Sequence, residues 1–269
     1  MKTKVSNKLD ANDIYTQSVL EGDSIGEAWQ YKVRVQKAIE ESKNPYWVNL
    51  DLDIQHSVVK PVTVAEAKKI IEEYEWLGCM PAISTYCYGI FFKDKVTGDE
   101  VCGGVVVYGK EYAENLGVWD KYGYTGKIIL LARGVCLHWT KKNTNSRLIM
   151  ESMKLLPPKY EVVTCTTDGY AGEIGTIYQA CNFYYVGVMR KGKERIGCVI
   201  DGKLYGGRSL RAKFGHQRKE DILKVCPDAK FIKQKAKDRY FYFRGSKKQK
   251  KENLSKIQHL IKPYPKRDV

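Results

Sequence analysis

Two charged residues end apolar segments of this chain, where their side chains could take part in chemistry. Arg133 follows the run Ile-Ile-Leu-Leu-Ala, and Asp168 ends a segment rich in β-branched residues, directly before a glycine. A charge beside such a run is costly without a partner, so Arg133 either binds a cofactor phosphate or substrate, or pairs with an acid at a sheet edge. Asp168 has the position where ligands gather in α/β proteins, but an Asp-Gly turn can also bind its own backbone. We predict that both are catalytic.

Tyr178 is a third candidate, on a short helix that we predict at residues 173–182. The apolar face of this helix consists of Ile174, Ile177 and Cys181, and Tyr178 lies at the edge of that face. A phenol in this position can protonate a leaving group. The alternative is a half-buried core tyrosine whose hydroxyl bonds a carbonyl. We predict the first role for Tyr178.

A polar segment before another predicted helix, Asn143-Thr-Asn-Ser146, is a candidate phosphate site. Backbone amides at the N-terminus of a helix bind phosphate groups, although a serine there can also serve only as a cap. We predict that Asn143, Thr144 and Ser146 bind a cofactor together with Arg133. No metal ligand is assigned, because the eight cysteines form no C-x-x-C motif and no histidine lies at zinc-finger spacing from a pair.

Alternating strands and helices must hold these residues in place. Thr63 and Glu66 match a capping box that starts a helix, and the apolar segment 127–136 predicts a central strand covered on both faces. The predicted strands are 57–60, 86–93, 100–108, 127–136, 160–167 and 183–189, and the predicted helices are 64–76, 145–156 and 173–182. Single helices between strands, with one antiparallel meander, give the α/β class with a mixed β-sheet and flanking helices.

The positive charge of the chain is concentrated in its last third. Residues 1–187 hold 21 Lys and Arg against 23 Asp and Glu, a balance of −2, whereas residues 188–269 hold 25 against 8, a balance of +17. The two balances sum to the net charge of +15. A basic segment with aromatic residues between its charges favours a polyanion, and nucleic acid is the expected partner.

Several residues of this basic segment are candidate contacts to nucleic acid. The densest group is Arg239-Tyr-Phe-Tyr-Phe-Arg244 with the lysines that follow it. In a strand, at most two of its four aromatic residues face outward to stack on bases; the alternative is an edge strand with its aromatics in the core and a solvated lysine helix behind it. The predicted contacts are Arg208, Arg211, Lys213, Arg239, Tyr240, Arg244, Lys247 and Lys248.

We expect three regions in the chain: an accessory extension at 1–56, a catalytic core at 57–187 and a basic binding extension at 188–269. The last region should contain a hairpin at 195–205, because Asp201-Gly202 suits a type I′ turn. No apolar run reaches the roughly 20 residues of a bilayer span, and the basic N-terminus lacks the apolar region of a signal peptide. We therefore expect a cytoplasmic protein.

The order of elements resembles the core of the GNAT acyltransferases, whose central strand splays from its neighbour to admit the thioester of acetyl-CoA. Several short sequence motifs give a more specific resemblance: over about residues 57–267 they are similar to motifs of the Mom family of phage DNA-modification proteins. In the core these motifs are Leu131-Ala-Arg133, Asn143-Thr-Asn-Ser-Arg147, Asp168, Gly172-Glu-Ile-Gly-Thr-Ile-Tyr-Gln-Ala-Cys-Asn-Phe183 and Tyr185-Val-Gly187. In the basic segment they are Arg208-Ser-Leu-Arg-Ala-Lys-Phe-Gly215, Arg239-Tyr-Phe-Tyr-Phe-Arg-Gly-Ser-Lys-Lys248 and Pro263-Tyr-Pro-Lys266.

This resemblance implies an enzyme that converts the exocyclic amine of adenine in DNA to a carbamoylmethyl derivative and so protects phage DNA from host restriction. It implies double-stranded DNA as partner, acetyl-CoA or a related thioester as cofactor, and Asp168 and Tyr178 near the reacting amine. The sequence departs from the resemblance at two places. The segment from His138 to Ser146 lacks the glycine-rich phosphate loop. Glu75-Trp-Leu-Gly78 occupies the position where the family has a motif that begins with histidine. A catalytic role of that histidine would be unfilled or would fall to Glu75.

Two further functions are compatible with the sequence. The first is a conventional GNAT N-acetyltransferase that uses acetyl-CoA on a small-molecule, protein or nucleic-acid amine. The second is a non-enzymatic binding protein with a degenerate GNAT body, which the missing glycine-rich loop favours. Consumption of acetyl-CoA without DNA would support the first, and failure to bind any coenzyme A compound or metal would support the second.

Overall fold

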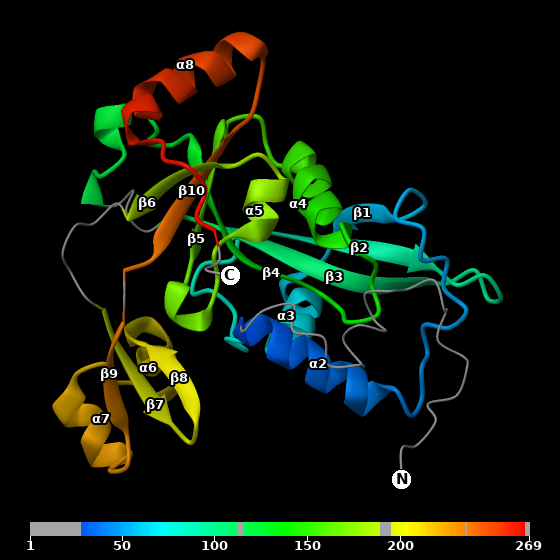
Figure 1. The fold of residues 1–269 in the computed structure, drawn as a ribbon, viewed down its shortest axis with the longest axis horizontal. Helices are drawn as coiled ribbons and strands as arrows, with labels where there is room; N and C mark the ends of the chain where they lie inside the picture. Colours follow the sequence, from blue (N-terminus) through cyan, green and yellow to red (C-terminus); the bar gives the residue numbers. More distant parts are fainter. Residues whose placement is uncertain (1–27, 112–115, 189–194, 235, 267–269) are drawn as a thin grey trace.

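The structure, a computed structural model, describes residues 28–111, 116–188, 195–234 and 236–266. Within these residues the chain forms a seven-stranded mixed sheet, helices on both of its faces and a separate three-stranded sheet (Figure 1). In spatial order, the large sheet contains β1 (Val58–Pro61), β2 (Tyr86–Lys93), β3 (Glu100–Gly109), β4 (Ile128–Cys136), β5 (Val162–Thr167), β10 (Asp238–Phe243) and β6 (Tyr184–Val188). The predicted α/β class with a mixed sheet and flanking helices is confirmed.

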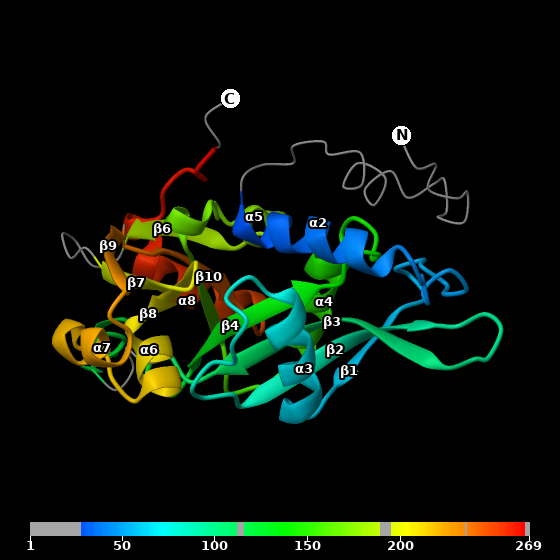
Figure 2. The same cartoon turned by 90° about the horizontal axis from the view of Figure 1, so that it is seen from below.

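Helices cover the large sheet because its strands carry apolar side chains on both faces. α3 (Val64–Tyr74) begins at the predicted capping box and packs on one face, which α8 (Lys247–Ile257) covers farther along. α4 (Thr144–Leu155) and α5 (Thr176–Ala180) lie on the opposite face from α3 (Figure 2). Short 3-10 helices occur at Asp120–Tyr122, Gly169–Ala171 and Gln258–Leu260. Across the described ranges, no helix is both long enough and apolar enough to cross a bilayer.

The parallel strands β4 and β5 stay together over only part of their length. Residues 128–130 pair with residues 162–164, and beyond this point the two strands separate toward their carboxyl ends. Backbone groups near the separation must therefore find partners other than the neighbouring strand. A central strand that splays from its neighbour is compatible with a GNAT-like core.

A β-bulge between β3 and β4 determines the direction of Arg133. Leu131 pairs with Tyr108 and belongs to the core beside α4, whereas Arg133 pairs with Val107, whose side chain packs beside α3. Residues two positions apart in a regular strand share a face, so the register shift between Val107 and Tyr108 is what turns Arg133 to the α3 side.

β10 comes from the basic C-terminal segment, yet it lies between β5 and β6. Tyr240 is fully buried, and its hydroxyl donates to the carbonyl of Ile174. Arg239 pairs with the buried Glu111 at 3.1 Å, and Arg244 donates to backbone carbonyls just after α4. Of the predicted DNA contacts, Tyr240 therefore lies in the core, and the guanidinium groups of Arg239 and Arg244 make contacts within the protein.

The segment between β6 and β10 forms a small unit of its own, residues 195–234, which we call the lobe. Its elements are β7 (Arg195–Ile200), β8 (Lys203–Gly206), α6 (Gly207–Phe214), α7 (Lys219–Val225) and β9 (Lys230–Gln234). The predicted hairpin is confirmed, because β7 pairs with β8 and both turn residues, Asp201 and Gly202, have positive φ. Beyond the predicted boundary at residue 187, the chain forms the lobe and then returns to the large sheet as β10.

Helix α2 (Trp29–Glu41), from the predicted accessory extension, contacts two connections of the core. Gln30 donates to the carbonyl of Tyr74 at 2.8 Å and accepts from the amide of Trp76 at 3.0 Å. Arg34 donates hydrogen bonds of 2.7–3.0 Å to four backbone carbonyls at the end of β4 and directly after it, those of Cys136, Leu137, His138 and Thr140. The helix therefore fixes both the end of α3 and the end of β4.

The contribution of Arg244 to the fold can be measured as a change in the free energy of unfolding. Its guanidinium donates to the carbonyls of Leu156, Pro157 and Tyr160. Arg244→Ala leaves these acceptors without their charged donor, so we expect the free energy of unfolding in urea to fall by about 3 kcal/mol. Lys247→Ala, at an exposed residue of α8, is the control and should change it by less than about 0.5 kcal/mol. Equal stability of Arg244→Ala and the wild type would contradict this role.

Candidate active site

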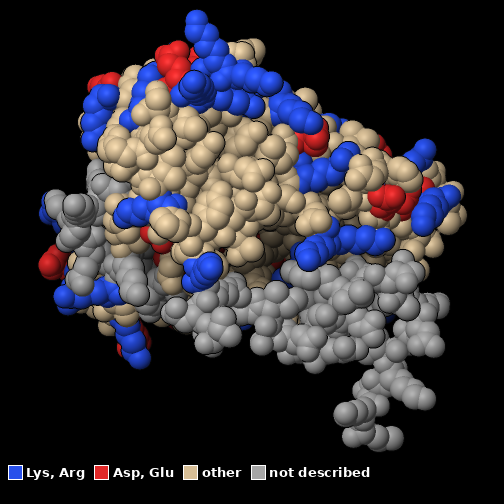
Figure 3. Space-filling view, turned by 45° about the horizontal axis from the view of Figure 1, so that its top comes forward, with Lys and Arg blue, Asp and Glu red and all other residues tan. Residues whose placement is uncertain are grey.

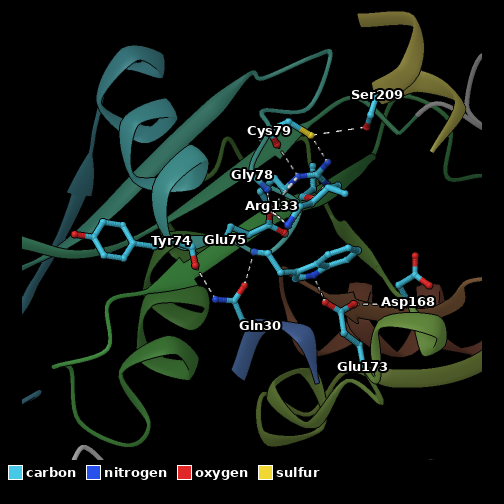
Figure 4. Close-up of polar contacts among 12 residues, drawn as sticks. Gln30, Tyr74, Glu75, Gly78, Cys79, Arg133, Asp168, Glu173 and Ser209 are labelled. Atoms are coloured by element: carbon cyan, nitrogen blue, oxygen red, sulfur yellow. Dashed lines mark hydrogen bonds and ion pairs between the residues drawn. The ribbon is translucent and has the colours of Figure 1, made fainter. Parts of the chain in front are cut away.

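A pocket of about 650 Å³ opens where β4 and β5 separate. Its walls come mainly from three parts of the chain: the connection after α3 (residues 76–82), the middle of β4 (residues 130–133) with the end of β5, and the lobe at residues 204–207, Ser209 and Lys213. Arg133 and Asp168 both line it, and Figure 4 shows them with Cys79 and Ser209. A volume of this size is typical of sites for small molecules and cofactors.

Arg133 is held against the connection after α3. Its Nε donates to the carbonyl of Cys79 at 3.0 Å and its Nη1 to the carbonyl of Ala132 at 2.7 Å (Figure 4). Its Nη2 is 3.9 Å from the Cys79 sulfur. With 19% of its side chain exposed, the guanidinium keeps a fixed charge at the pocket wall.

Glu75 lies behind Arg133, with its Oε2 at 4.0 Å from the guanidinium Nε. The backbone amides of Leu77 and Gly78 donate to the same oxygen at 3.0 and 3.1 Å. Burial raises the pKa of Glu75 to about 7; the nearby Arg133 lowers it and Glu173 raises it further. This carboxyl can therefore gain or lose a proton near neutral pH, as a general acid or base does.

Glu173 joins the end of β5 to the connection after α3. Its Oε2 accepts the backbone amide of Asp168 at 2.8 Å, and its Oε1 accepts the indole N–H of Trp76 at 2.8 Å. Burial raises the pKa of Glu173, and these two hydrogen bonds oppose that shift. Asp168 is 3% exposed, and the ammonium group of Lys237 lies 3.2 Å from its Oδ2.

The pocket therefore combines acidic and cationic groups in a space partly closed to water. The carboxylate of Asp168, with Lys237 as counter-charge, can accept a hydrogen bond or a proton from a nitrogen. Arg133, Lys213 and Lys237 can bind an anionic group or stabilise negative charge that develops during a reaction. Among the described residues, no group of three His, Cys, Asp or Glu side chains is arranged to hold a metal ion.

Tyr178 lies outside the lining of this pocket. Its hydroxyl interacts with the thiol of Cys165, which precedes the pocket residue Thr166 and so faces the other side of β5. Burial raises the pKa of Tyr178 well above its usual value, which makes the phenol a weaker acid. Of the three predicted catalytic residues, the structure brings Arg133 and Asp168 into one pocket and leaves Tyr178 in the core.

The predicted phosphate site at the start of α4 also lies away from the pocket. Thr144 is fully buried, and the hydroxyl of Ser146 donates to the carbonyl of Asn143 at 2.9 Å. The connection before α4 directs four carbonyls to Arg34, and carbonyl oxygens do not attract a phosphate. Of the residues predicted to bind a cofactor, the pocket contains Arg133, whereas Asn143, Thr144 and Ser146 lie outside its lining.

The lobe places cations beside the pocket. Residues 195–234 hold ten Lys and Arg against four Asp and Glu. Of the predicted DNA contacts, Lys213 lines the pocket and Arg211 is exposed on the same helix, α6. Arg208 also belongs to α6, but its side chain falls outside the described residues. The lobe can therefore contact phosphates of a duplex whose base enters the pocket.

A second group of cations lies on α8, where Figure 3 shows Lys and Arg gathered at the top of the view. This group contains the predicted contacts Lys247 and Lys248. β10 is antiparallel to β5, so Asp238 pairs with the end of β5 and Phe243 with its start. α8 follows Phe243, so its lysines lie beyond the opposite end of β5 from Asp168. The structure does not bring them to the pocket.

Three residues of this site were not assigned to it from the sequence. Lys237 is one lysine among many in the basic segment, and Glu173 was expected only to suit the start of a helix. Trp76 belongs to the motif Glu75-Trp-Leu-Gly78, which differs from the corresponding motif of the family. This difference is the one sequence signal that points to the connection after α3.

Stability should depend on pH through Glu75. Its pKa is about 7 in the folded protein against an ordinary value of 4.5, so the folded state holds this proton more tightly than the unfolded chain. The stabilisation that comes from this tighter proton binding is fully present below pH 4.5 and is lost as the pH rises through 7. Glu75→Gln has no such proton to lose, so its free energy of unfolding relative to wild type should rise by about 2 kcal/mol from pH 5 to pH 8.

Urea unfolding of both proteins across this pH range measures the difference. Glu72→Gln changes an exposed carboxylate that also lines the pocket and is the matched control. A difference between Glu75→Gln and wild type that stays constant with pH would show that Glu75 does not hold its proton in this way.

Comparison with known proteins identifies the family. The model of the Mom protein family matches residues 56–266, a range that contains both sides of the pocket and the lobe. A comparison with curated proteins gave no match. Because the family match covers well over half of the 269 residues, the chain belongs to the Mom protein family.

Proposed function

We propose that this protein attaches a carbamoylmethyl group to the exocyclic amine of adenine in duplex DNA and thereby protects phage DNA from host restriction. Membership of the Mom family makes it a DNA-modifying enzyme of phage type. The observation that carries the finer proposal is the pocket where β4 and β5 separate, whose lining contains Arg133, Asp168 and residues of the basic lobe.

The target amine must leave the base stack before it can react. In a duplex, the exocyclic amine of adenine is paired and its ring is stacked, so an enzyme acting on it flips the nucleotide out. The cost is a few kcal/mol, which phosphate contacts elsewhere on the protein can offset. Arg211 and Lys213 are suited to this role, because they lie on the lobe helix that borders the pocket.

The residues of the pocket match what a weakly nucleophilic amine requires. The lone pair of this amine is delocalised into the ring, so orientation and removal of its proton matter more than a strong base. Asp168 can accept a hydrogen bond from the amine and take its proton as the new N–C bond forms, with Lys237 as the counter-charge. As this bond forms, the bond between the donor carbon and its carrier group breaks and the carrier leaves with the electron pair. Arg133 can stabilise the negative charge on the departing carrier, and Glu75 can hold or return a proton behind it.

The donor is expected to bind in the pocket itself. A coenzyme A thioester, expected from the family resemblance, would place its anionic phosphates against the cationic side chains of Arg133, Lys213 and Lys237 in the pocket. A conventional acetyltransferase for small amines would use the same pocket but would not need cations beside its entrance. The lobe therefore favours a nucleic-acid substrate.

Expression in bacteria tests the reaction directly. We expect DNA from cells that make the protein to contain deoxyadenosine heavier by one carbamoylmethyl group, measured by mass spectrometry of digested nucleosides. An unchanged nucleoside profile despite soluble protein would contradict the proposed function. Asp168→Asn should lower the modified fraction by about 10²- to 10⁴-fold at equal protein level, because the amide cannot take a proton.

The matched control is Tyr178→Phe, which removes one hydroxyl from the core beside the same strand. Because that hydroxyl lies outside the pocket, we expect this variant to keep most of the activity. A loss as large as that of Asp168→Asn would restore Tyr178 to the catalytic role expected from the sequence.

DNA affinity distinguishes the two groups of cations. The double variant Arg211→Ala/Lys213→Ala removes two candidate phosphate contacts, so we expect the slope of log affinity against log salt to become shallower by about 2. Lys247→Ala/Lys248→Ala removes the same charge from α8 and should leave the slope nearly unchanged. Fluorescence anisotropy with a labelled duplex at several salt concentrations gives both slopes; the reverse pattern would place the DNA on α8.

A further inference from the structure

We propose that Trp76 is the platform on which the extruded adenine ring stacks, an inference that rests on the proposed function. Trp76 lines the pocket from the connection after α3, and Leu204 and Tyr205 line it from the lobe. An enzyme that flips a base must replace the stacking that the base loses in the duplex, and aromatic side chains provide this for any base.

The indole of Trp76 is held in place on several sides. Its N–H donates to Glu173 at 2.8 Å, its backbone amide donates to Gln30 at 3.0 Å, and its ring packs edge-to-face on Trp29 at 5.3 Å. A side chain fixed in this way loses little further freedom when a ligand binds, so more of the stacking energy appears as affinity. Two of the three contacts come from α2, which lies outside the family match at residues 56–266.

The position of the ring also suits the chemistry at Asp168. One carboxylate, that of Glu173, accepts the indole N–H of Trp76 through one oxygen and the backbone amide of Asp168 through the other. The ring and the end of β5 are therefore fixed relative to each other across a single side chain. A purine whose face rests on the indole is therefore held in the same pocket as Asp168, beside this end of β5.

The probe for this proposal is a duplex in which 2-aminopurine stands opposite an abasic site. The base has no pairing partner, so it enters the pocket without the cost of breaking a pair. Its emission falls when it stacks on an indole and is high when it is unstacked. We expect the wild-type protein at saturation to give low emission and Trp76→Leu to give clearly higher emission.

Affinity provides the second measurement. Loss of stacking should weaken binding of this probe by about 10-fold in Trp76→Leu. Binding of a fully paired duplex without an abasic site should be nearly unchanged, because the lobe carries the phosphate contacts. Trp76→Phe keeps an aromatic face but, like Trp76→Leu, loses the hydrogen bond to Glu173. We expect it to stay within about 3-fold of the wild type, since it can still stack.

This pair of variants separates stacking from a structural role. If Trp76 served only to hold Glu173, both variants would lose the same hydrogen bond and behave alike, which would overturn the proposal. Equal emission from Trp76→Leu and wild type would do the same, as would a loss of affinity for acetyl-CoA with unchanged affinity for the probe. If the wild type modifies cellular DNA while any of these results holds, the platform is wrong and the proposed function stands; a wild type that neither binds the probe nor modifies DNA refutes both.

Discussion

The separation of β4 from β5 after three residue pairs is the constraint on which the rest of this structure depends. Where two parallel strands part, their backbone groups lose their partners and must be satisfied in another way. Arg133 meets part of this need, because its guanidinium binds the carbonyl of Ala132 on its own strand and that of Cys79 across the gap. The same side chain thus joins β4 to the connection after α3 and places a charge in the pocket lining. A bulge in β4 is what directs it there.

Positive charge serves separate purposes in different parts of this chain. Arg34, Arg239 and Arg244 bind backbone carbonyls or a buried carboxylate and hold elements of the fold together. The cations of the lobe border the pocket, whereas those of α8 lie beyond the other end of the sheet. A guanidinium suits the interior because its five donors can satisfy several acceptors at once. Net charge alone therefore overstates how much of the basic segment is available to a polyanion.

The sequence predicted local structure well and long-range placement poorly. Interactions within a few residues determine the capping box at Thr63, the turn at Asp201-Gly202 and the apolar run of β4. Their sequence patterns are therefore sufficient to predict them. The position of β10 between β5 and β6 is set by pairing across many residues, and no local pattern reveals it. In the candidate site, Arg133 and Asp168 could be predicted because each is a charged residue at the end of an apolar segment. Trp76 and Glu173 could not be found in this way, because their roles come from the approach of two distant connections.

The late position of β10 in the chain has a consequence for biosynthesis. The ribosome makes β5 and β6 first, then the whole lobe, and only afterwards the strand that joins them. The lobe has its own apolar core and is able to fold while the nascent chain is still attached, but the large sheet has an open gap until residue 243 has emerged. Until then, β5 and β6 each have an edge without the partner that β10 provides. Residues up to 243 must therefore have been synthesised, the whole lobe among them, before the large sheet can close.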